Sequence, residues 1–568
     1  MEYIWNYLPE AKQEDVDHLV DVLKISPTLC KLLVQRGVKT FDDAKTFFRP
    51  QLTDLHNPFL MKDMDKAVNR LEKAMVASEK ILVYGDYDVD GTTSVALVYS
   101  FLYEFYTNIE YYIPNRYNEG YGVSFAGINH AAEIGVSLII ALDCGIKAVD
   151  KVEYAKKQGI DFIICDHHTP GSKLPEAVAV LDPKREDCEY PFNELSGCGV
   201  GFKFLQAFSE RNNIPFEKLT KHLDLVAVSI ASDIVPIIGE NRILAYFGLK
   251  QLNSQPRMGL QSLIKVAGIE GKELDITDVV FKIGPRINAA GRIESGSNAV
   301  QLLISTEEQE AKRFGDVINE FNTTRKNYDH NITQEALEII QNDKDQLKKR
   351  TTVLFQPHWH KGVIGIVASR LIETYYRPTI ILTESHGKAT GSARSVNGFN
   401  LYNAIDACSD LLDSFGGHKY AAGLTLKIEN IPEFKRRFEQ IVAETIHDDM
   451  LLPQIDVDTK LDFEEINTRF YRILKQFAPF GPENMSPVFV SEGVVDCGSR
   501  LVGSTGEHLR VECKQKNMQF TGIAFSMANK LELLRNNPKI DICYAITENE
   551  FKGKTSLQLM VKDIKTKH

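Results

Sequence analysis

The organisation of this chain is set by one stretch of sequence, Val83-Tyr84-Gly85-Asp86-Tyr87-Asp88-Val89-Asp90-Gly91-Thr92-Thr93-Ser94. An apolar run over 81–83 precedes it and a helical pattern from Thr92 to about Phe105 follows it, so the three aspartates lie between a buried strand and a helix. Such turns are where parallel α/β sheets bind ligands. Three carboxylates this close repel one another unless a cation lies between them, and Mg²⁺ or Mn²⁺ suits carboxylate oxygens. The stretch therefore predicts a metal site.

Two other interpretations of the acidic turn need to be considered. The spacing Asp-x-Asp-x-Asp-Gly also opens the calcium loop of an EF-hand, which requires a bidentate glutamate at its twelfth position. Counted from Asp86, that position is Leu97, which excludes the calcium loop. The other interpretation is a solvated acidic turn without a ligand, and it is weakened only by residues found further along the chain.

The length and composition indicate a protein of several globular domains. A chain of 568 residues is too long for one hydrophobic core and corresponds to roughly three to four domains. Hydrophobic residues at 43% and charged residues at 25% are ordinary for globular proteins. The formal net charge of -11 argues against a general nucleic-acid coat, so a polyanionic partner must bind in a local basic groove.

Cysteine usage and the N-terminus indicate a cytoplasmic location. The nine cysteines include no Cys-x-x-Cys pair and no His/Cys cluster at zinc spacing, so we expect reduced, mostly buried thiols. The N-terminus has no basic segment followed by an apolar one, and no apolar run approaches the roughly 20 residues that cross a bilayer. We therefore expect no membrane partner.

Between about 66 and 235, short apolar runs alternate with helix-length segments. The runs are rich in Ile, Val and Tyr and lie at 81–84, 110–113, 137–142, 162–165 and 178–181. This alternation is typical of βαβ units and predicts an α/β fold with a mostly parallel, doubly wound sheet. The residues that end these runs should then lie at one edge of the sheet.

Acidic residues and imidazoles follow several of these runs. Asp143 follows 138–142, the triplet Asp166-His167-His168 follows 162–165, and Asp233 follows an apolar helical stretch. Each alone has an ordinary explanation, since a carboxylate at a strand end is commonly a helix N-cap and a histidine pair commonly lies in a polar loop. Together with the first turn, they can hold two divalent ions that share a carboxylate. Two metals about 4 Å apart suit in-line displacement at phosphorus, which predicts hydrolysis of a phosphoric ester or anhydride.

These motifs resemble those of a known superfamily. The segments 85–91, 143–145, 166–168 and 232–233 are similar to the four motifs of the DHH phosphoesterases, and within that superfamily the chain resembles the RecJ exonucleases. Many superfamily members have a histidine where this chain has Tyr84, and RecJ proteins typically also lack it. The resemblance extends over the whole chain, through Pro114-Asn115-Arg116, Glu119-Gly120-Tyr121-Gly122, Gly197-Cys198-Gly199-Val200, Pro285-Arg286-Ile287-Asn288-Ala289-Ala290-Gly291-Arg292 and Gly416-Gly417-His418.

The resemblance implies a division of ligands between two ions, Mn²⁺ or Mg²⁺. It assigns Asp88 to one ion and Asp90, His167 and Asp233 to the other, with Asp143 bridging both. The full set of metal ligands that it implies is Asp86, Asp88, Asp90, Asp143, His167 and Asp233.

The resemblance leaves two roles open for Asp86, Asp166 and His168. Asp86 and Asp166 lie close enough in sequence to bind an ion directly or to support a ligand. His168 would contact substrate phosphate or orient a ligand. The implied catalytic residues are Asp166, His167 and His168.

A second α/β domain is predicted beyond a charged segment with helical spacing at 298–350. In the resembled family a long helix joins two lobes, and the second lobe is of the DHHA1 type. In the segment 387–395, glycines let backbone N–H groups approach an anion and Arg394 can grip a phosphate, although alone the segment is typical of a surface turn. The resemblance implies that these residues hold the 5′ end of a strand or line its path: Arg116, Arg286, Asn288, Arg292, Ser392, Arg394, Gly416, Gly417 and His418.

Five short β-prone runs after about 455 predict a small barrel of the OB-fold type. Its residues Phe489, Phe520 and Tyr544 can stack on a single strand or form a core. The predicted domains are a helical unit at 1–60, a DHH domain at 61–297, a connecting helix at 298–350, a DHHA1 domain at 351–454 and an OB-fold at 455–568.

The activity implied by the resemblance is that of a single-stranded-DNA-specific 5′-to-3′ exonuclease that releases 5′-mononucleotides in DNA repair and recombination. The implied partners are a 5′-ended single strand, a helicase and a single-strand-binding protein, and the chain would be a monomer. Two alternatives stay open: a DHH phosphodiesterase acting on dinucleotides or cyclic dinucleotides, and a non-catalytic Cdc45-like scaffold, which has lost metal ligands.

Overall fold

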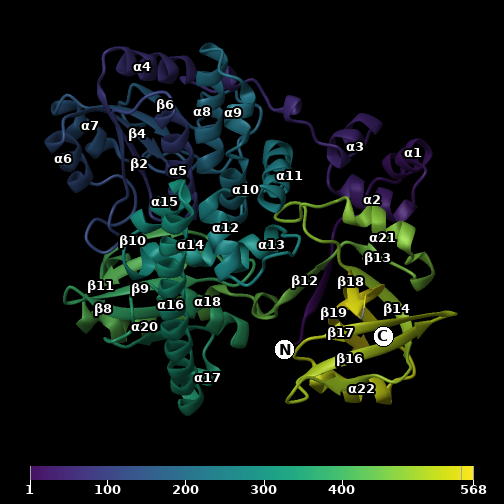
Figure 1. Ribbon diagram of the computed structural model, residues 1–568. Coiled ribbons are helices and arrows are strands. Elements are labelled where there is room, and N and C mark those ends of the chain that lie inside the picture. Colours follow the sequence, from purple (N-terminus) through teal and green to yellow (C-terminus); the bar gives the residue numbers. More distant parts are fainter. Residues whose placement is uncertain (1, 552, 567–568) are drawn as a thin grey trace. The chain divides into compact units, whose positions relative to one another are not determined.

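The structure is a computed structural model that describes residues 2–551 and 553–566, and these form two compact units. The aspartate unit, as we name it, comprises Asp42–Thr324 and Gln476–Met485. The terminal unit comprises the described residues before Asp42, the segment Arg325–Lys475 and the described residues from Ser486 onward. Figure 1 labels the elements of both units along the chain.

A five-stranded parallel sheet is the centre of the aspartate unit. In spatial order its strands are β3 (Ile109–Tyr112), β2 (Lys80–Gly85), β4 (Val136–Leu142), β5 (Asp161–Cys165) and β6 (Ala179–Leu181). Every strand lies where an apolar run predicts it, shifted by at most one residue at either end. The predicted doubly wound parallel sheet is confirmed.

Successive side chains of these strands enter two separate cores, because neighbours along a strand point to opposite faces. Ile81 and Val83 belong to one core, while Leu82 and Tyr84 belong to the other. In Figure 1 the helices of the two cores lie on opposite sides of the sheet. The first core includes α4 (Met64–Val76), α5 (Val89–Tyr103) and α8 (Gly197–Arg211), and the second includes α6 (Phe125–Glu133) and α7 (Val149–Lys157).

The rest of the aspartate unit is helical. The apolar stretch before Asp233, predicted to be helical, forms the almost fully buried helix α10. The helices are α3 (Phe41–Phe48), α9 (Phe216–Thr220), α10 (Leu223–Ser232), α11 (Gly239–Ser254), α12 (Met258–Val266), α13 (Ile276–Asp278), α14 (Gly284–Ile293) and α15 (Ser297–Ile304). The charged segment that follows forms α16 (Glu308–Asn342), which continues from the aspartate unit into the terminal unit, and α17 (Lys344–Lys348).

The first large sheet of the terminal unit is mixed. Its order is β10 (Leu412–His418), β11 (Ala421–Leu426), β9 (Lys388–Arg394), β8 (Thr379–Ser385) and β7 (Thr352–Phe355), and only β7 and β8 pair in parallel. Its helices are α18 (Ile364–Thr374), α19 (Leu401–Asp406) and α20 (Ile431–Thr445). The surface turn that residues 387–395 suggest by themselves is wrong, because most of that segment is strand β9. Its residues Ala389 and Ala393 are fully buried on one face.

The C-terminal sheet has seven strands and confirms the predicted barrel, since β14 pairs with both β18 and β16 and so closes the ring. Its strands are β13 (Thr459–Lys460), β14 (Phe489–Asp496), β18 (Ile540–Phe551), β19 (Lys554–Thr566), β17 (Met518–Ala524), β16 (His508–Gln515) and β15 (Arg500–Val502), with α22 (Leu531–Asn536). Phe489 and Tyr544 are fully buried, and Phe520 packs on the buried Phe463. Phe489 and Tyr544 therefore belong to a core and cannot stack on a nucleic-acid strand, whereas Phe520 is half-buried.

The N-terminal residues contribute a strand as well as the predicted helices. β1 (Ile4–Tyr7) pairs in parallel with β12 (Gln454–Val457). The nearby helices are α1 (Gln13–Leu23), α2 (Pro27–Gln35) and α21 (Thr468–Lys475). All nine cysteines are free and most are buried, as predicted. Among the described residues, the helices are all too short or too polar to span a bilayer.

Candidate metal centre

The predicted acidic residues meet where the strand order of the parallel sheet reverses. β3 lies on one side of β2, and β4 with the later strands lies on the other, so the switch point lies beyond the carboxyl ends of β2 and β4. Asp86 follows β2, Asp143 follows β4 and Asp166 follows β5. The sheet topology therefore brings residues that are 80 positions apart in sequence to one edge.

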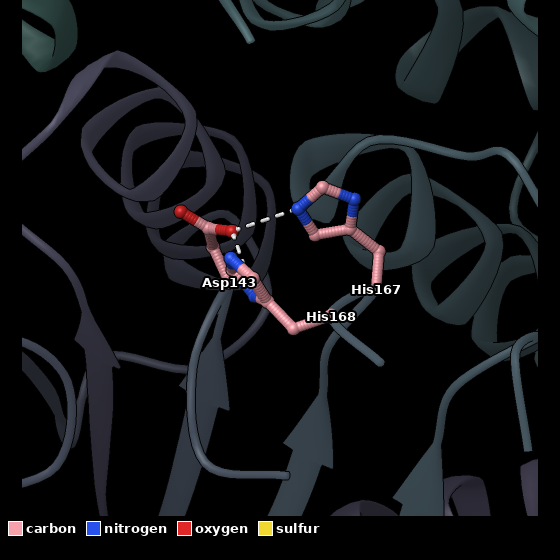
Figure 2. Close-up of side chains that lie close together, drawn as sticks. All are labelled: Asp143, His167 and His168. Atoms are coloured by element: carbon pink, nitrogen blue, oxygen red, sulfur yellow. Dashed lines mark ion pairs between the residues drawn. The ribbon is translucent and has the colours of Figure 1, made fainter. Parts of the chain in front are cut away.

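The imidazole of His167 lies among three carboxylates. Its Nε2 is 3.2 Å from Oδ1 of Asp143 and 3.6 Å from Oδ2 of both Asp90 and Asp233. Figure 2 shows Asp143 facing both histidines, and Nδ1 of His168 lies 3.9 Å from the same Asp143 oxygen. These side chains form two groups that can each hold an ion, one around Asp143 and one around Asp90 and Asp233, with His167 in both.

Several buried atoms of this cluster have no hydrogen-bond partner among the described residues. They are Oδ2 of Asp143, Oδ2 of Asp86 and both ring nitrogens of His167. A buried polar atom without a partner is destabilising. Divalent ions coordinated by carboxylates and imidazole would satisfy these atoms, so the residues fit the predicted Mn²⁺ or Mg²⁺ ions.

The carboxylates are crowded enough to raise one another's pKa in the absence of a cation. Burial, together with the charges of Asp90 and Asp88, raises the pKa of Asp143 well above its ordinary value. The same causes raise the pKa of Asp233 to about 8, and burial with the Asp88 charge raises the pKa of Asp86. Because a bound cation stabilises the charged form of each group, the centre favours divalent ions electrostatically.

Asp90 is held by the N-terminus of α8. Its Oδ2 accepts a hydrogen bond from the backbone N–H of Gly197 at 2.7 Å, and its Oδ1 accepts from Cys198 N–H at 2.8 Å and from the Ser229 hydroxyl at 2.7 Å. Unpaired N–H groups at a helix N-terminus favour negative charge. The Asp90 carboxylate is therefore fixed beside His167.

Two further aspartates are set by backbone geometry. Asp88 is the N-cap of α5, and its Oδ1 accepts the N–H of Gly91 at 2.9 Å. Asp143 has a φ of 57°, in the left-handed region. A Cβ added to Gly197 would lie 2.6 Å from Cβ of Asp143, so only glycine fits there.

Asp166 is fully engaged by hydrogen bonds and supports His168. Its Oδ1 lies 2.8 Å from Nδ1 of His168, and its Oδ2 accepts the N–H of Ile146 at 2.9 Å. Burial alone would lower the pKa of His168, but the Asp166 hydrogen bond and nearby carboxylates raise it to about 9. Of the two roles considered for Asp166, this geometry favours support of a neighbouring group over direct binding of an ion.

Two side chains of the centre lie outside the predicted set. The Tyr121 hydroxyl donates to the Asp143 carbonyl at 3.4 Å and lies 3.2 Å from Nε2 of His168. Glycines on both sides of Tyr121 are the sequence signal for the tight turn that brings it there. Ser229, which binds Asp90, has a weaker signal because it is one of two serines in a mostly apolar helix.

The predicted substrate residues of the aspartate unit fall into two places. The Arg116 guanidinium lies 4.8 Å from the centroid of the Tyr87 ring, and the charge of Arg292 also acts on Tyr87, beside the acidic turn. Arg286 is engaged within the helices, since it donates to Asn319 Oδ1 at 3.1 Å and to the Lys282 carbonyl at 2.6 Å. The fourth predicted residue, half-buried in α14, is Asn288.

The predicted substrate residues of the terminal unit lie on β9 and β10, the two strands that flank β11. Through β11, Ser392 is in register with Gly416, and Arg394 is in register with His418. The Arg394 guanidinium donates to Ser392 Oγ at 3.0 Å. Gly365 at the start of α18 lies beside both, since a Cβ there would be 2.9 Å from Ser392 Oγ and 3.0 Å from Arg394 Nη2. The other residue of this group, Gly417, has a φ of 148°.

Family models match the chain in three places. The DHH family, N-terminal domain, matches residues 80–230, the DHHA1 domain matches 348–444 and the RecJ OB domain matches 457–563. The parallel sheet and its acidic cluster thus define a protein of the DHH class.

Comparison with whole proteins narrows this class. The single-stranded-DNA-specific exonuclease RecJ of Bacillus subtilis (strain 168) is 37% identical, covering 97% of this chain and 69% of that protein. The RecJ of Escherichia coli (strain K12) is 32% identical over 98% of this chain and 99% of that protein. A crystal structure of RecJ from Thermus thermophilus with Mn²⁺ matches with a TM-score of 0.86 at 27% identity, covering 100% of this chain and 80% of that one. The chain belongs to the RecJ family.

Proposed function

We propose that this chain is a metal-dependent exonuclease that degrades single-stranded DNA from the 5′ end and releases 5′-mononucleotides. The observation that carries the proposal is the position of His167 Nε2, which lies within 3.6 Å of carboxylates from Asp90, Asp143 and Asp233 and has no hydrogen-bond partner among the described residues. The relatives named for this activity cover nearly the whole chain.

The proposed assignment of the ions follows the ligands implied by the sequence. Asp88 and Asp143 would hold one ion, and Asp90, Asp143, His167 and Asp233 the other, with Asp86 supporting them. When bound, two divalent ions lower the pKa of a water and neutralise charge at the scissile phosphate.

The chain's own residues would add positive charge and orientation. His168, which the Asp166 hydrogen bond orients, would contact a phosphate oxygen of the DNA strand. Arg116 and Arg292 would bind phosphates beside the centre. Ser392 and Arg394 would bind the 5′ end.

The wider role is also a proposal and follows the predicted domain bounds. The DHH domain at 61–297 would hold the ions, the DHHA1 domain at 351–454 would hold the 5′ end, and the barrel at 455–568 would bind the single strand. We further propose that the chain acts as a cytoplasmic monomer in DNA repair and recombination, alongside a helicase and a single-strand-binding protein.

A labelled-strand assay tests the activity. A single strand with a 5′-phosphate, labelled at its 5′ end, should release labelled mononucleotide at once in Mn²⁺ or Mg²⁺, and none in EDTA. The same strand labelled at its 3′ end should shorten progressively, and a blunt duplex should persist. Hydrolysis of a dinucleotide without degradation of the long strand would reject the proposal.

A further inference from the structure

The segment Gln476–Met485, which we name the return segment, belongs to the aspartate unit although the chain on both sides of it belongs to the terminal unit. It forms a closed loop. Gly481 and Asn484 exchange backbone hydrogen bonds of 3.1 and 2.9 Å, and the buried Asn484 side chain donates to the carbonyls of Phe477 and Pro479, both at 2.9 Å. The loop therefore has a shape of its own.

A buried arginine of α11 fastens this loop to the aspartate unit. The Arg242 guanidinium donates to the carbonyls of Phe477 at 2.9 Å, Ala478 at 3.1 Å and Pro479 at 3.4 Å. It also donates to the Phe47 carbonyl at 2.9 Å and lies 3.9 Å from the centroid of that ring. Because the guanidinium is planar with donors in a fixed fork, these contacts define one position for the loop.

The tip of the return segment contacts the loop that follows Asp233. The Pro482 carbonyl accepts the backbone N–H of Ile237 at 2.8 Å. Gly481 packs so closely that a Cβ there would lie 2.5 Å from Cγ1 of Ile237, whose side chain is fully buried. Any shift of this tip would therefore move Ile237.

Asp233 lies at the start of this loop. It directly follows α10, and Ile234 after it has a φ of 60°, which β-branched residues rarely adopt. The Ile234 side chain is 62% exposed, so its own packing contributes little. The turn is held by its continuation, where Asn241 donates to the Pro236 carbonyl at 3.0 Å and the return segment holds Ile237. Strained turns persist where their surroundings fix them.

We propose that the return segment is a positioning element for Asp233. By fixing Ile237, it sets where the Asp233 carboxylate lies relative to His167, and so it tunes the ion that these residues bind. The inference rests on the proposed function in that Asp233 is taken as a metal ligand. Groups that support metal ligands typically change metal affinity by roughly 10- to 100-fold.

Two variants of the full-length chain test this coupling. Gly481→Ala adds a methyl group against Ile237, and Asn484→Ala opens the loop by removing side-chain donors without adding atoms. Glu483→Gln, on the exposed side of the same loop, is the matched control. In a calorimetric Mn²⁺ titration we expect one of two ions to bind at least about 10-fold more weakly in both variants, and the control to match wild type.

A nuclease assay adds a second readout. Turnover by both variants should recover as Mn²⁺ is raised, as expected when only the affinity for an ion is reduced. Asp233→Asn supplies the reference for loss of the ligand itself, and circular dichroism establishes folding. If Gly481→Ala does not fold, Asn484→Ala carries the test.

The inference is overturned if a folded variant of the return segment binds both ions as wild type does. Failure of the proposed function would look different. A wild-type chain that binds Mn²⁺ without degrading single-stranded DNA would reject the proposed exonuclease activity. The effect of Gly481→Ala on the affinity of the ion at Asp233 could still be measured.

Discussion

Asp143 shows how much a single residue contributes at this centre. It is buried, it lies 3.2 Å from His167 Nε2, and its left-handed backbone would disfavour most substitutes. Asn tolerates that conformation better than Ala, so Asp143→Asn is the sharper variant. We expect it to stay folded and to lose turnover by more than the roughly 10- to 100-fold typical of supporting groups. The bound metal and the rate of DNA degradation measure the loss. Asp150→Asn, on the exposed side of α7, is the control. Undiminished turnover of Asp143→Asn would refute the bridging role.

The buried His222, which is not part of the metal centre, should make the folded chain less stable at acid pH. Burial, then the charges of Arg257 and Lys221, lower its pKa to about 3 in the folded chain. In the unfolded chain, the His222 imidazole takes up a proton near the ordinary histidine pKa of 6.5. The free energy of unfolding therefore decreases as the pH falls from 6.5 towards 3, by at most about 1.4 kcal/mol per pH unit.

Urea unfolding between pH 7 and 4.5 measures this contribution. His222→Gln should lose less stability over the window than wild type, whereas His18→Gln, at an exposed position of α1, should follow wild type. If the free energy of unfolding changed with pH equally in wild type and His222→Gln, the buried imidazole would not contribute to the acid sensitivity.

At the scale of elements, the residues of β9 lead to a prediction about how the 5′ end of a DNA strand is bound. Arg394 and Ser392 lie together on this strand. Charge-assisted hydrogen bonds contribute about 1.5–3 kcal/mol, so Arg394→Ala should raise KM roughly 10- to 100-fold on 5′-phosphorylated strands and much less on 5′-hydroxyl strands. Lys388→Gln, exposed on the same strand, is the control. Equal loss on both substrates would contradict the end-binding role.

Helices α8 and α11 are joined by a buried ion pair. Lys203 Nζ lies 3.0 Å from Oε1 of Glu240, the Tyr190 hydroxyl donates to Oε2 at 2.6 Å, and the two charged side chains are almost fully buried. Lys203→Met should cost roughly 3–5 kcal/mol, because it leaves the carboxylate buried without its partner. In urea unfolding, the double variant Lys203→Met/Glu240→Gln should recover most of this, and Lys157→Met on the surface of α7 should change nothing. A double variant as unstable as the single one would contradict this account.

The sequence predicts the strands of the parallel sheet well because short runs rich in Ile and Val favour buried strands. It fails for β9, whose Ala389, Gly391 and Ala393 have low strand propensity and become a strand only through pairing with β8 and β11. The acidic motifs predict which side chains gather at the switch point. They do not predict Ser229 or Tyr121, because these join through tertiary packing.

At the scale of the whole molecule, the division into units does not follow contiguous stretches of sequence. The return segment contains Pro479, Gly481 and Pro482, a composition typical of a linker between the second α/β domain and the barrel. Its real partners, Arg242 and Ile237, lie more than two hundred residues earlier, and no local pattern marks such a contact.

The return segment also fixes the order in which the molecule can be completed. All other residues of the aspartate unit have been synthesised once Thr324 is made, but its last ten residues follow only after the chain has passed through Arg325–Lys475. At ordinary translation rates this delay is roughly ten to thirty seconds. During that time the nascent aspartate unit carries its acidic residues while the Asp233 loop lacks its contact with Pro482, so the growing chain would acquire a fully formed ion site only near the end of its synthesis.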